Sequence, residues 1–82
     1  MKNSIYTNEM NVLCQWLKSQ RKAQKLTMRS LSERMDRPHS FIQKVEQGER
    51  RLDVVEYVWY CEKLNIDPIV GIKLVIKQHK DD

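Results

Sequence analysis

Polar side chains that can hydrogen-bond to nucleic-acid bases cluster in the segment PHSFIQKVEQG, from Pro38 to Gly48. The segment begins with a proline suited to the first turn of a helix and ends with the glycine that commonly terminates one. Ile42 and Val45 supply the buried edge of this predicted helix. The composition of the remaining face suits the major groove of DNA, but an ordinary solvated surface would look the same. That face is free of carboxylates and consists of His39, Ser40, Gln43, Lys44 and Gln47.

A second short helix is predicted immediately before this segment. Thr27 is a good N-cap, because its hydroxyl can accept a free amide hydrogen of the first turn. Met28, Leu31 and Met35 follow at spacings of three and four, which places them on one helical face. The pattern breaks at Asp36. Two short helices joined by a three- to four-residue turn form a helix-turn-helix unit.

Composition and charge fit one small domain with an anionic partner. The 82 residues include 40% hydrophobic and 32% charged residues, which predicts a single globular domain over 1–82. The segment from Lys18 to Arg51 contains ten basic and four acidic residues, so it has a charge of +6, whereas the rest has −2. A basic segment centred on a helix-turn-helix is typical of nucleic-acid binders. For any single charged residue, a solvated face remains the simpler interpretation.

Several protein classes are not expected from this sequence. It has neither an apolar run long enough to span a membrane nor an apolar signal core, so we expect a cytoplasmic protein. Cys14 and Cys61 are 47 positions apart, which is neither a metal-binding spacing nor a disulfide framework. A glycine-rich phosphate loop and a nucleophile paired with a base are also missing. We therefore expect no enzymatic activity, no cofactor and no metal.

Two further helices are predicted to pack on the helix-turn-helix. Residues 1–7 form a loose end, and residues 8–24 form a helix whose core-facing residues are Val12, Leu13, Trp16, Leu17 and Ala23. The other helix spans residues 54–64, between an N-cap at Asp53 and a left-handed C-cap at Asn65. Its core-facing residues are Val54, Tyr57, Tyr60, Cys61 and Leu64. Cys61 is interpreted there as a small buried hydrophobe.

The last predicted helix has more apolar surface than one buried face requires. It begins at the Asp67-Pro68 start signal and ends near residue 78, before a loose tail at 79–82. One stripe consists of Ile69, Ile72 and Ile76, and a second of Val70 and Leu74. We expect the second stripe to contact another copy of the chain. The hypothesis is a homodimer interface of Val55, Trp59, Val70 and Leu74; the alternative is that these residues wrap the monomer core.

The run SFIQKVEQGERRLDVVEYVWYCEKLNIDPI (40–69) resembles the lambda-repressor-like domain of the XRE family of transcription regulators. The similarity includes the recognition helix, a Glu-x-Gly-x-Arg connector, the next helix and an Asp-Pro start to the last one. It covers roughly residues 10–78. The resemblance implies an all-α, compact five-helix domain with the helix-turn-helix as its second and third helices.

The resemblance also implies roles for individual residues. The base-contacting positions would be His39, Ser40, Gln43 and Lys44. The phosphate-contacting positions would be Thr27, Met28, Arg29, Gln47 and Arg50, helped by Arg21 or Lys22. Arg21 and Glu46 would form a structural ion pair. The sequence departs from the family pattern at Met28, commonly Gln, at Asp36, commonly Gly, and at His39, frequently Gln.

The leading functional hypothesis is a sequence-specific regulator of transcription that binds double-stranded DNA, acting as a dimeric repressor on a palindromic operator. Phage-type repressor, restriction–modification controller and antitoxin all remain open as contexts. The alternative is a protein-interaction module or antitoxin whose main partner is another protein and whose DNA binding is weak. Met28 and Asp36 favour this alternative, because neither suits a phosphate-binding surface.

Overall fold

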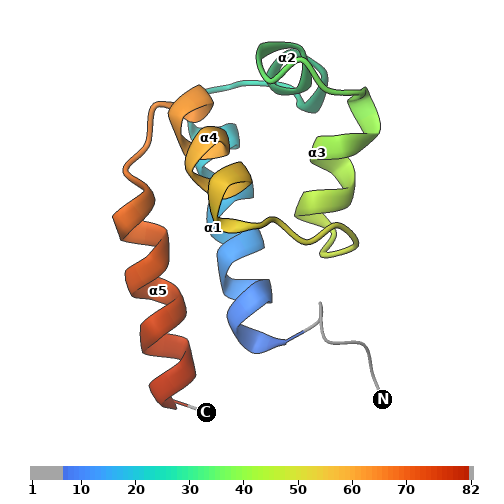
Figure 1. Cartoon of the computed structure of the whole chain (residues 1–82). Coiled ribbons are helices and arrows are strands. Elements are labelled where there is room, and N and C mark those ends of the chain that lie inside the picture. Colours follow the sequence, from blue (N-terminus) through green and yellow to red (C-terminus); the bar gives the residue numbers. More distant parts are fainter. Residues whose placement is uncertain (1–6, 82) are drawn as a thin grey trace.

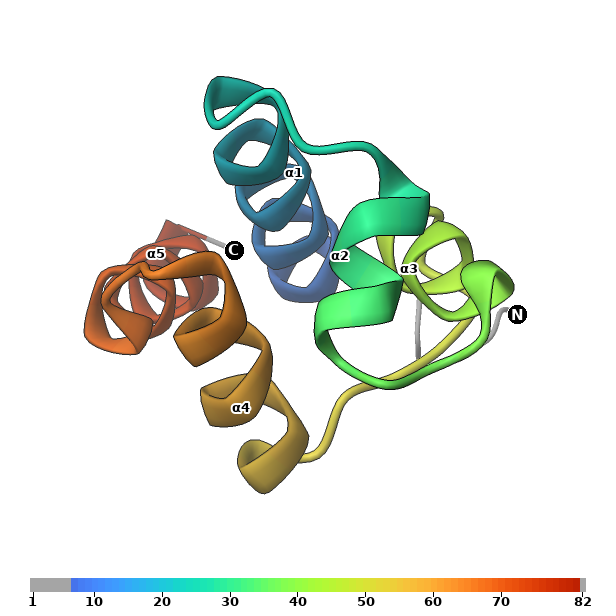
Figure 2. The ribbon, with the colours of Figure 1, turned by 90° about the horizontal axis from the view of Figure 1, so that it is seen from above.

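Five helices form the protein in the computed structural model, which describes residues 7–81. They are α1 (Asn8–Ala23), α2 (Met28–Arg34), α3 (His39–Glu46), α4 (Val54–Leu64) and α5 (Pro68–Asp81). No strand occurs within that range, so the predicted all-α, five-helix arrangement is confirmed. Seen from two directions, α2 and α3 lie on one side of α1 and α4, and α5 lies on the other (Figures 1 and 2).

Side-chain caps fix the beginnings of α2, α4 and α5 as predicted. Thr27 Oγ1 accepts the backbone amide of Ser30 at 3.0 Å, and Ser30 Oγ accepts the amide of Thr27 at 3.1 Å. Asp53 makes the same reciprocal arrangement with Glu56 at the start of α4. Asp67 accepts the amide two positions further on, at 2.9 Å. Each cap satisfies amides that a helix leaves unpaired in its first turn.

The turns that separate the helices use left-handed backbone conformations. Asn65 (φ 56°) adopts it as predicted, and so does Gly48 (φ 76°), the predicted end of α3; Asp36 (φ 55°) and Lys25 (φ 59°) adopt it as well. Pro38 was predicted in the first turn of α3 but occupies the N-cap position, so the helix begins one residue later. These single left-handed residues redirect the chain between consecutive helices.

Most of the predicted core residues are buried, with two corrections. Ala23 is exposed because it is the last residue of α1, where the chain turns away from the core. Val54 is 77% exposed because it is the first residue of α4, at the rim of the domain. Phe41 was not predicted to be inside, yet it is 7% exposed and its ring centroid lies 6.3 Å from that of Tyr60. The buried apolar cluster comprises Leu13, Leu17, Leu31, Met35, Phe41, Ile42, Val45, Tyr57, Tyr60, Cys61 and Leu64.

Helix α5 packs through Gly71 rather than through its isoleucines. A Cβ atom at Gly71 would lie 2.2 Å from the Tyr57 hydroxyl and 2.5 Å from the Trp16 ring, so only glycine permits this close approach. Tyr57 donates a hydrogen bond to the carbonyl of Pro68 at 2.6 Å, which holds its ring in that position. The stripe expected to be buried is 41–55% exposed, and it consists of Ile69, Ile72 and Ile76.

The ends of the described chain are more ordered than predicted. Helix α5 continues to Asp81, and His79 Nδ1 lies 3.0 Å from Glu9 Oε2 near the start of α1. Thr7, placed by the sequence in the loose end, caps α1 by accepting the amide of Met10 at 3.1 Å. The rest of the predicted loose ends, residues 1–6 and 82, lie outside the described range. None of the helices within residues 7–81 is long and apolar enough to cross a membrane.

Candidate nucleic-acid interface

The outer face of α3 has the composition predicted for base recognition. Ile42 and Val45 are fully buried beneath it, so the opposite side of the helix must face solvent. All five polar residues on that side are exposed: His39, Ser40, Gln43, Lys44 and Gln47. Their hydroxyl, amide and amine groups can meet the donor and acceptor patterns of base edges, and the carboxylate of α3, Glu46, is buried.

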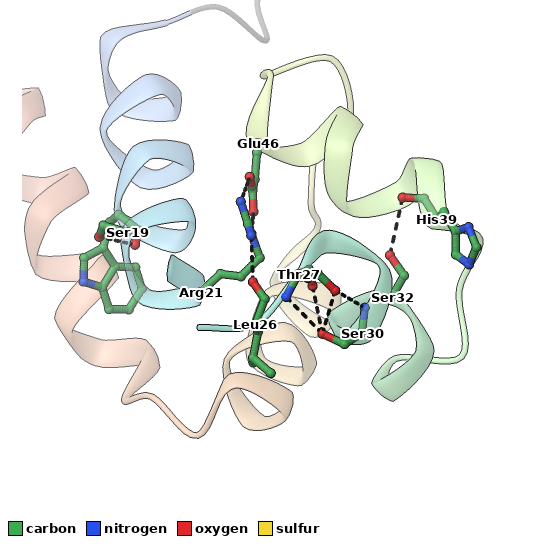
Figure 3. A network of polar contacts seen from close by, with 9 residues as sticks. Ser19, Arg21, Leu26, Thr27, Ser30, Ser32, His39 and Glu46 are labelled. Carbon is green, nitrogen blue, oxygen red and sulfur yellow. Dashed lines mark hydrogen bonds and ion pairs between the residues drawn. The ribbon is translucent and has the colours of Figure 1, made fainter. Parts of the chain in front are cut away.

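The beginning of α3 is attached to α2 by Ser32. This serine is fully buried, and its hydroxyl donates to the carbonyl of His39 at 3.4 Å (Figure 3). The carbonyl of Ser32 accepts the amide of Arg37 at 2.9 Å. The two hydrogen bonds fix the turn of the helix-turn-helix, which therefore presents α3 at a set angle to α2.

The end of α3 is attached to α1 by a buried ion pair. Arg21 Nε donates to Glu46 Oε2 at 2.6 Å, and a terminal nitrogen of Arg21 donates to Oε1 at 3.0 Å. The other terminal nitrogen donates to the carbonyl of Leu26 at 2.8 Å (Figure 3). The side chains are 8% and 2% exposed. The hydrogen bonds to Glu46 raise the pKa of Arg21, so the guanidinium remains charged in this site.

This geometry confirms the expected ion pair and corrects a second role assigned to Arg21. Its guanidinium is enclosed and bonded to Glu46 and Leu26, so it is not available to a DNA phosphate. Lys22, the alternative named with it, is exposed. Any phosphate contact from the end of α1 must therefore come from Lys22.

The other predicted phosphate-contacting residues differ in their accessibility. Thr27, Arg29 and Gln47 are exposed at the start of α2 and the end of α3. Met28 is half-buried and packs against the core, so its thioether faces inward and offers nothing to a phosphate. Arg50 is partly exposed, and its guanidinium is paired within the protein.

Arg50 is paired with Glu56 of α4. Two guanidinium–carboxylate contacts of 2.7 and 3.1 Å make the pair bidentate, and Arg50 also donates to the carbonyl of Arg51. The hydrogen bonds from Arg50 lower the pKa of Glu56, which keeps the carboxylate ionised. The Arg50 side chain retains 39% exposure. Glu56 binds the inner edge of the guanidinium. Only its outer edge can therefore meet a phosphate.

The two cysteines are buried components of the core. Cys14 and Cys61 are free thiols with 2% and 0% exposure. Burial raises the pKa of both thiols, so they are not reactive thiolates. Within residues 7–81, no three side chains of the metal-binding types come together.

The face predicted for dimerisation is not continuous. Ile72 lines a groove of about 470 Å³ together with Val54 of α4, so this side of α5 faces α4. Val70 and Leu74 project from roughly the opposite side of α5, given about 3.6 residues per turn. On α4, the half-buried Trp59 faces the helix-turn-helix, where Arg37 lies 4.9 Å from its ring centroid.

A different apolar surface is exposed around that groove. Its members on α4 and α5 are 41–77% exposed: Val54, Val58, Ile69, Ile72 and Ile76. Two of them, Val54 and Ile72, line the groove itself. The interface predicted from the sequence consisted of Val55, Trp59, Val70 and Leu74. Of these four residues, Val55 (77%) and Val70 (45%) are exposed. The apolar excess predicted from the sequence is therefore present, and it includes two of the four predicted residues as well as others.

Comparison with solved structures identifies the family of the chain. An XRE-family like protein from Pseudomonas syringae pv. tomato is 32% identical to the chain and superimposes with a TM-score of 0.81, covering 92% of both chains. The chain belongs to the XRE family. No protein-family model matches the sequence, and no curated protein does.

Two restriction–modification controller proteins share the XRE-type fold. A point mutant of C.Esp1396I is 18% identical, with a TM-score of 0.75 over 88% of this chain and 91% of that one. C.AhdI from Aeromonas hydrophila is 23% identical, with a TM-score of 0.73 over 79% of this chain and 98% of that one. At these identities the similarity establishes the fold alone.

The ion pair leads to a test of stability. Glu46→Leu should lower the free energy of unfolding by about 3–5 kcal/mol, because it leaves the buried charge of Arg21 without a partner. The double variant Arg21→Met with Glu46→Leu should recover most of that loss, since no buried charge remains. Urea denaturation followed by circular dichroism measures the free energy of unfolding of the double variant and of the single variants Glu46→Leu and Arg21→Met. If the double variant is as unstable as the sum of its single variants, the two residues do not act as a pair.

Proposed function

We propose that the protein is a transcription regulator that binds double-stranded DNA in a sequence-specific manner through α3. The observation that supports this most strongly is the exposed, carboxylate-free face of α3. Hydrogen bonds hold this helix in place at both of its ends. Ser32 holds one end of the helix and Arg21 the other, so its outer side chains keep fixed positions. Membership of the XRE family supports the same proposal.

Within this proposal, the residues at base edges are His39, Ser40, Gln43 and Lys44. The phosphate-contacting residues are Lys22, Thr27, Arg29 and Gln47, with the outer edge of Arg50. Arg21 and Glu46 neutralise each other inside the protein. The net charge of +6 in the segment from Lys18 to Arg51 therefore comes from the other charged residues. This charge would supply most of the affinity and make it dependent on salt.

Two alanine variants separate these roles. Gln43→Ala should reduce discrimination between the preferred site and other duplexes by about 1–3 kcal/mol, as for loss of one bidentate base contact. Arg29→Ala should weaken binding to all duplexes alike and lower the salt slope by about one phosphate contact. Fluorescence anisotropy titrations at several salt concentrations measure both. If the two variants lose affinity in the same sequence-independent way, α3 does not read bases.

We further propose that two copies associate through the apolar surface around the groove. One copy measures 35 × 27 × 22 Å, and α3 lies on the side opposite α5 (Figure 2). Two copies joined at this surface therefore present their recognition helices at the two ends of the dimer. A symmetric dimer presents two equivalent recognition helices, as a palindromic site requires.

Two neighbouring residues of α5 distinguish this surface from the one predicted by sequence. Ile69→Glu should abolish dimerisation, and Val70→Glu should not, because the two side chains project from different sides of the helix. Both variants place an acid in the first turn of α5, where the helix dipole favours it, so the pair is matched for helix stability. Sedimentation velocity at micromolar concentration measures the outcome. Loss of the dimer in Val70→Glu alone would restore the sequence-based interface, and a monomeric wild type would exclude both.

A further inference from the structure

An arginine outside the DNA-facing set connects the recognition helix to α4. Arg37 lies in the turn before α3, and its guanidinium carbon is 4.9 Å from the ring centroid of Trp59 and 5.5 Å from that of Phe41. A guanidinium within about 6 Å of an aromatic ring is attracted by the negative charge of the ring face. Phe41 belongs to the first turn of α3 and Trp59 to α4. Arg37 therefore joins the two helices through one cation.

A second guanidinium contacts the same phenylalanine. Arg50 lies 5.2 Å from the centroid of Phe41 and forms the bidentate pair with Glu56 of α4. Arg37 also lowers the pKa of Glu56 through its charge, although less than Arg50 does through hydrogen bonds. The buried ring of Phe41 is thus contacted by two cations, both of which are attached to α4.

The Arg37 side chain contacts aromatic rings where a hydrogen-bond partner is missing. Its Nε atom is buried and has no hydrogen-bond partner, an arrangement that normally destabilises a protein. A side chain that merely filled this space could be apolar at lower cost. The charge of Arg37 must therefore contribute more than packing. Its contact with two aromatic rings from different helices fixes the relative orientation of those helices.

We propose that Arg37 is a positioning residue that sets the orientation of the recognition helix against α4. The proposal rests on the proposed DNA-binding function, because its consequence is base selectivity. Hydrogen bonds to base edges require donor–acceptor distances of about 2.7–3.2 Å, so a small tilt of α3 disturbs them. The residues most affected are those nearest Arg37, namely His39 and Ser40 in the first turn of α3.

The test replaces the cation and keeps its apolar stem. Arg37→Met removes the charge and the planar group without leaving a hydrogen-bond partner unsatisfied, because Nε has none. Arg34→Met is the matched control, since this exposed arginine also reaches α4, donating to the carbonyl of Lys63 at 3.2 Å, but contacts no ring. Both variants lose one positive charge from the same part of the molecule.

Anisotropy titrations with the duplex selected by the wild type and with a scrambled duplex give the first readout. Arg37→Met should reduce the ratio of specific to non-specific affinity about tenfold, comparable to losing part of a bidentate base contact. Arg34→Met should leave the ratio unchanged. An unchanged ratio in Arg37→Met, with lowered thermal stability only, would overturn the proposal. A salt slope lower by about one than in Arg34→Met would also overturn it, since it would show a direct phosphate contact.

Amide hydrogen exchange without DNA gives a second readout that does not depend on the proposed function. In Arg37→Met, the backbone amides of α3 should exchange faster than in the wild type, whereas those of α1 should not change. Equal exchange in α3 of both proteins would overturn the positioning role. If the wild type selects no duplex, the DNA-binding function fails, and this comparison still decides whether Arg37 orders α3.

Discussion

The buried pair of Arg21 and Glu46 is the constraint on which the rest of the structure depends. It connects the last turn of α1 to the last turn of α3 at 2.6 and 3.0 Å, across 25 positions of sequence. A third hydrogen bond from Arg21 fixes the carbonyl of Leu26, just before α2 begins. The guanidinium of Arg21 therefore fixes the relative positions of α1, α3 and the segment that leads into α2. Because a buried charge is costly when unpaired, a displacement of α3 that breaks the pair would be strongly destabilising.

The constraint determines how the faces of α3 are used. Glu46 is the acid of α3, and its pairing inside the molecule keeps a negative charge away from the outer face. The inner face is apolar, with Phe41, Ile42 and Val45 packed against the core. The outer residues are exposed to solvent and can hydrogen-bond with a ligand. A short helix of 8 residues can do both because neighbouring helices, and not its own length, hold it in place.

Local signals in the sequence were sufficient for the helices and for the outer face of α3. Caps such as Thr27 and Asp53 act within three residues, so their effect can be inferred without a tertiary structure. The packing of α5 could not be inferred in this way. Its contact depends on the missing side chain of Gly71, and three isoleucines were a stronger but misleading signal. Contacts between distant side chains, such as Arg37 with Trp59, also leave no periodic pattern in a sequence.

The most direct test of the central claim, that α3 recognises base sequence, is selection from a random library of duplexes by the wild-type protein at low salt. The proposal predicts enrichment of a palindrome whose half-site centres are about 34 Å apart, one turn of the double helix. Failure to enrich any sequence, while the protein remains folded, would contradict it. In that case the exposed face of α3 would be an ordinary solvated surface, and the XRE fold of this chain would serve another partner.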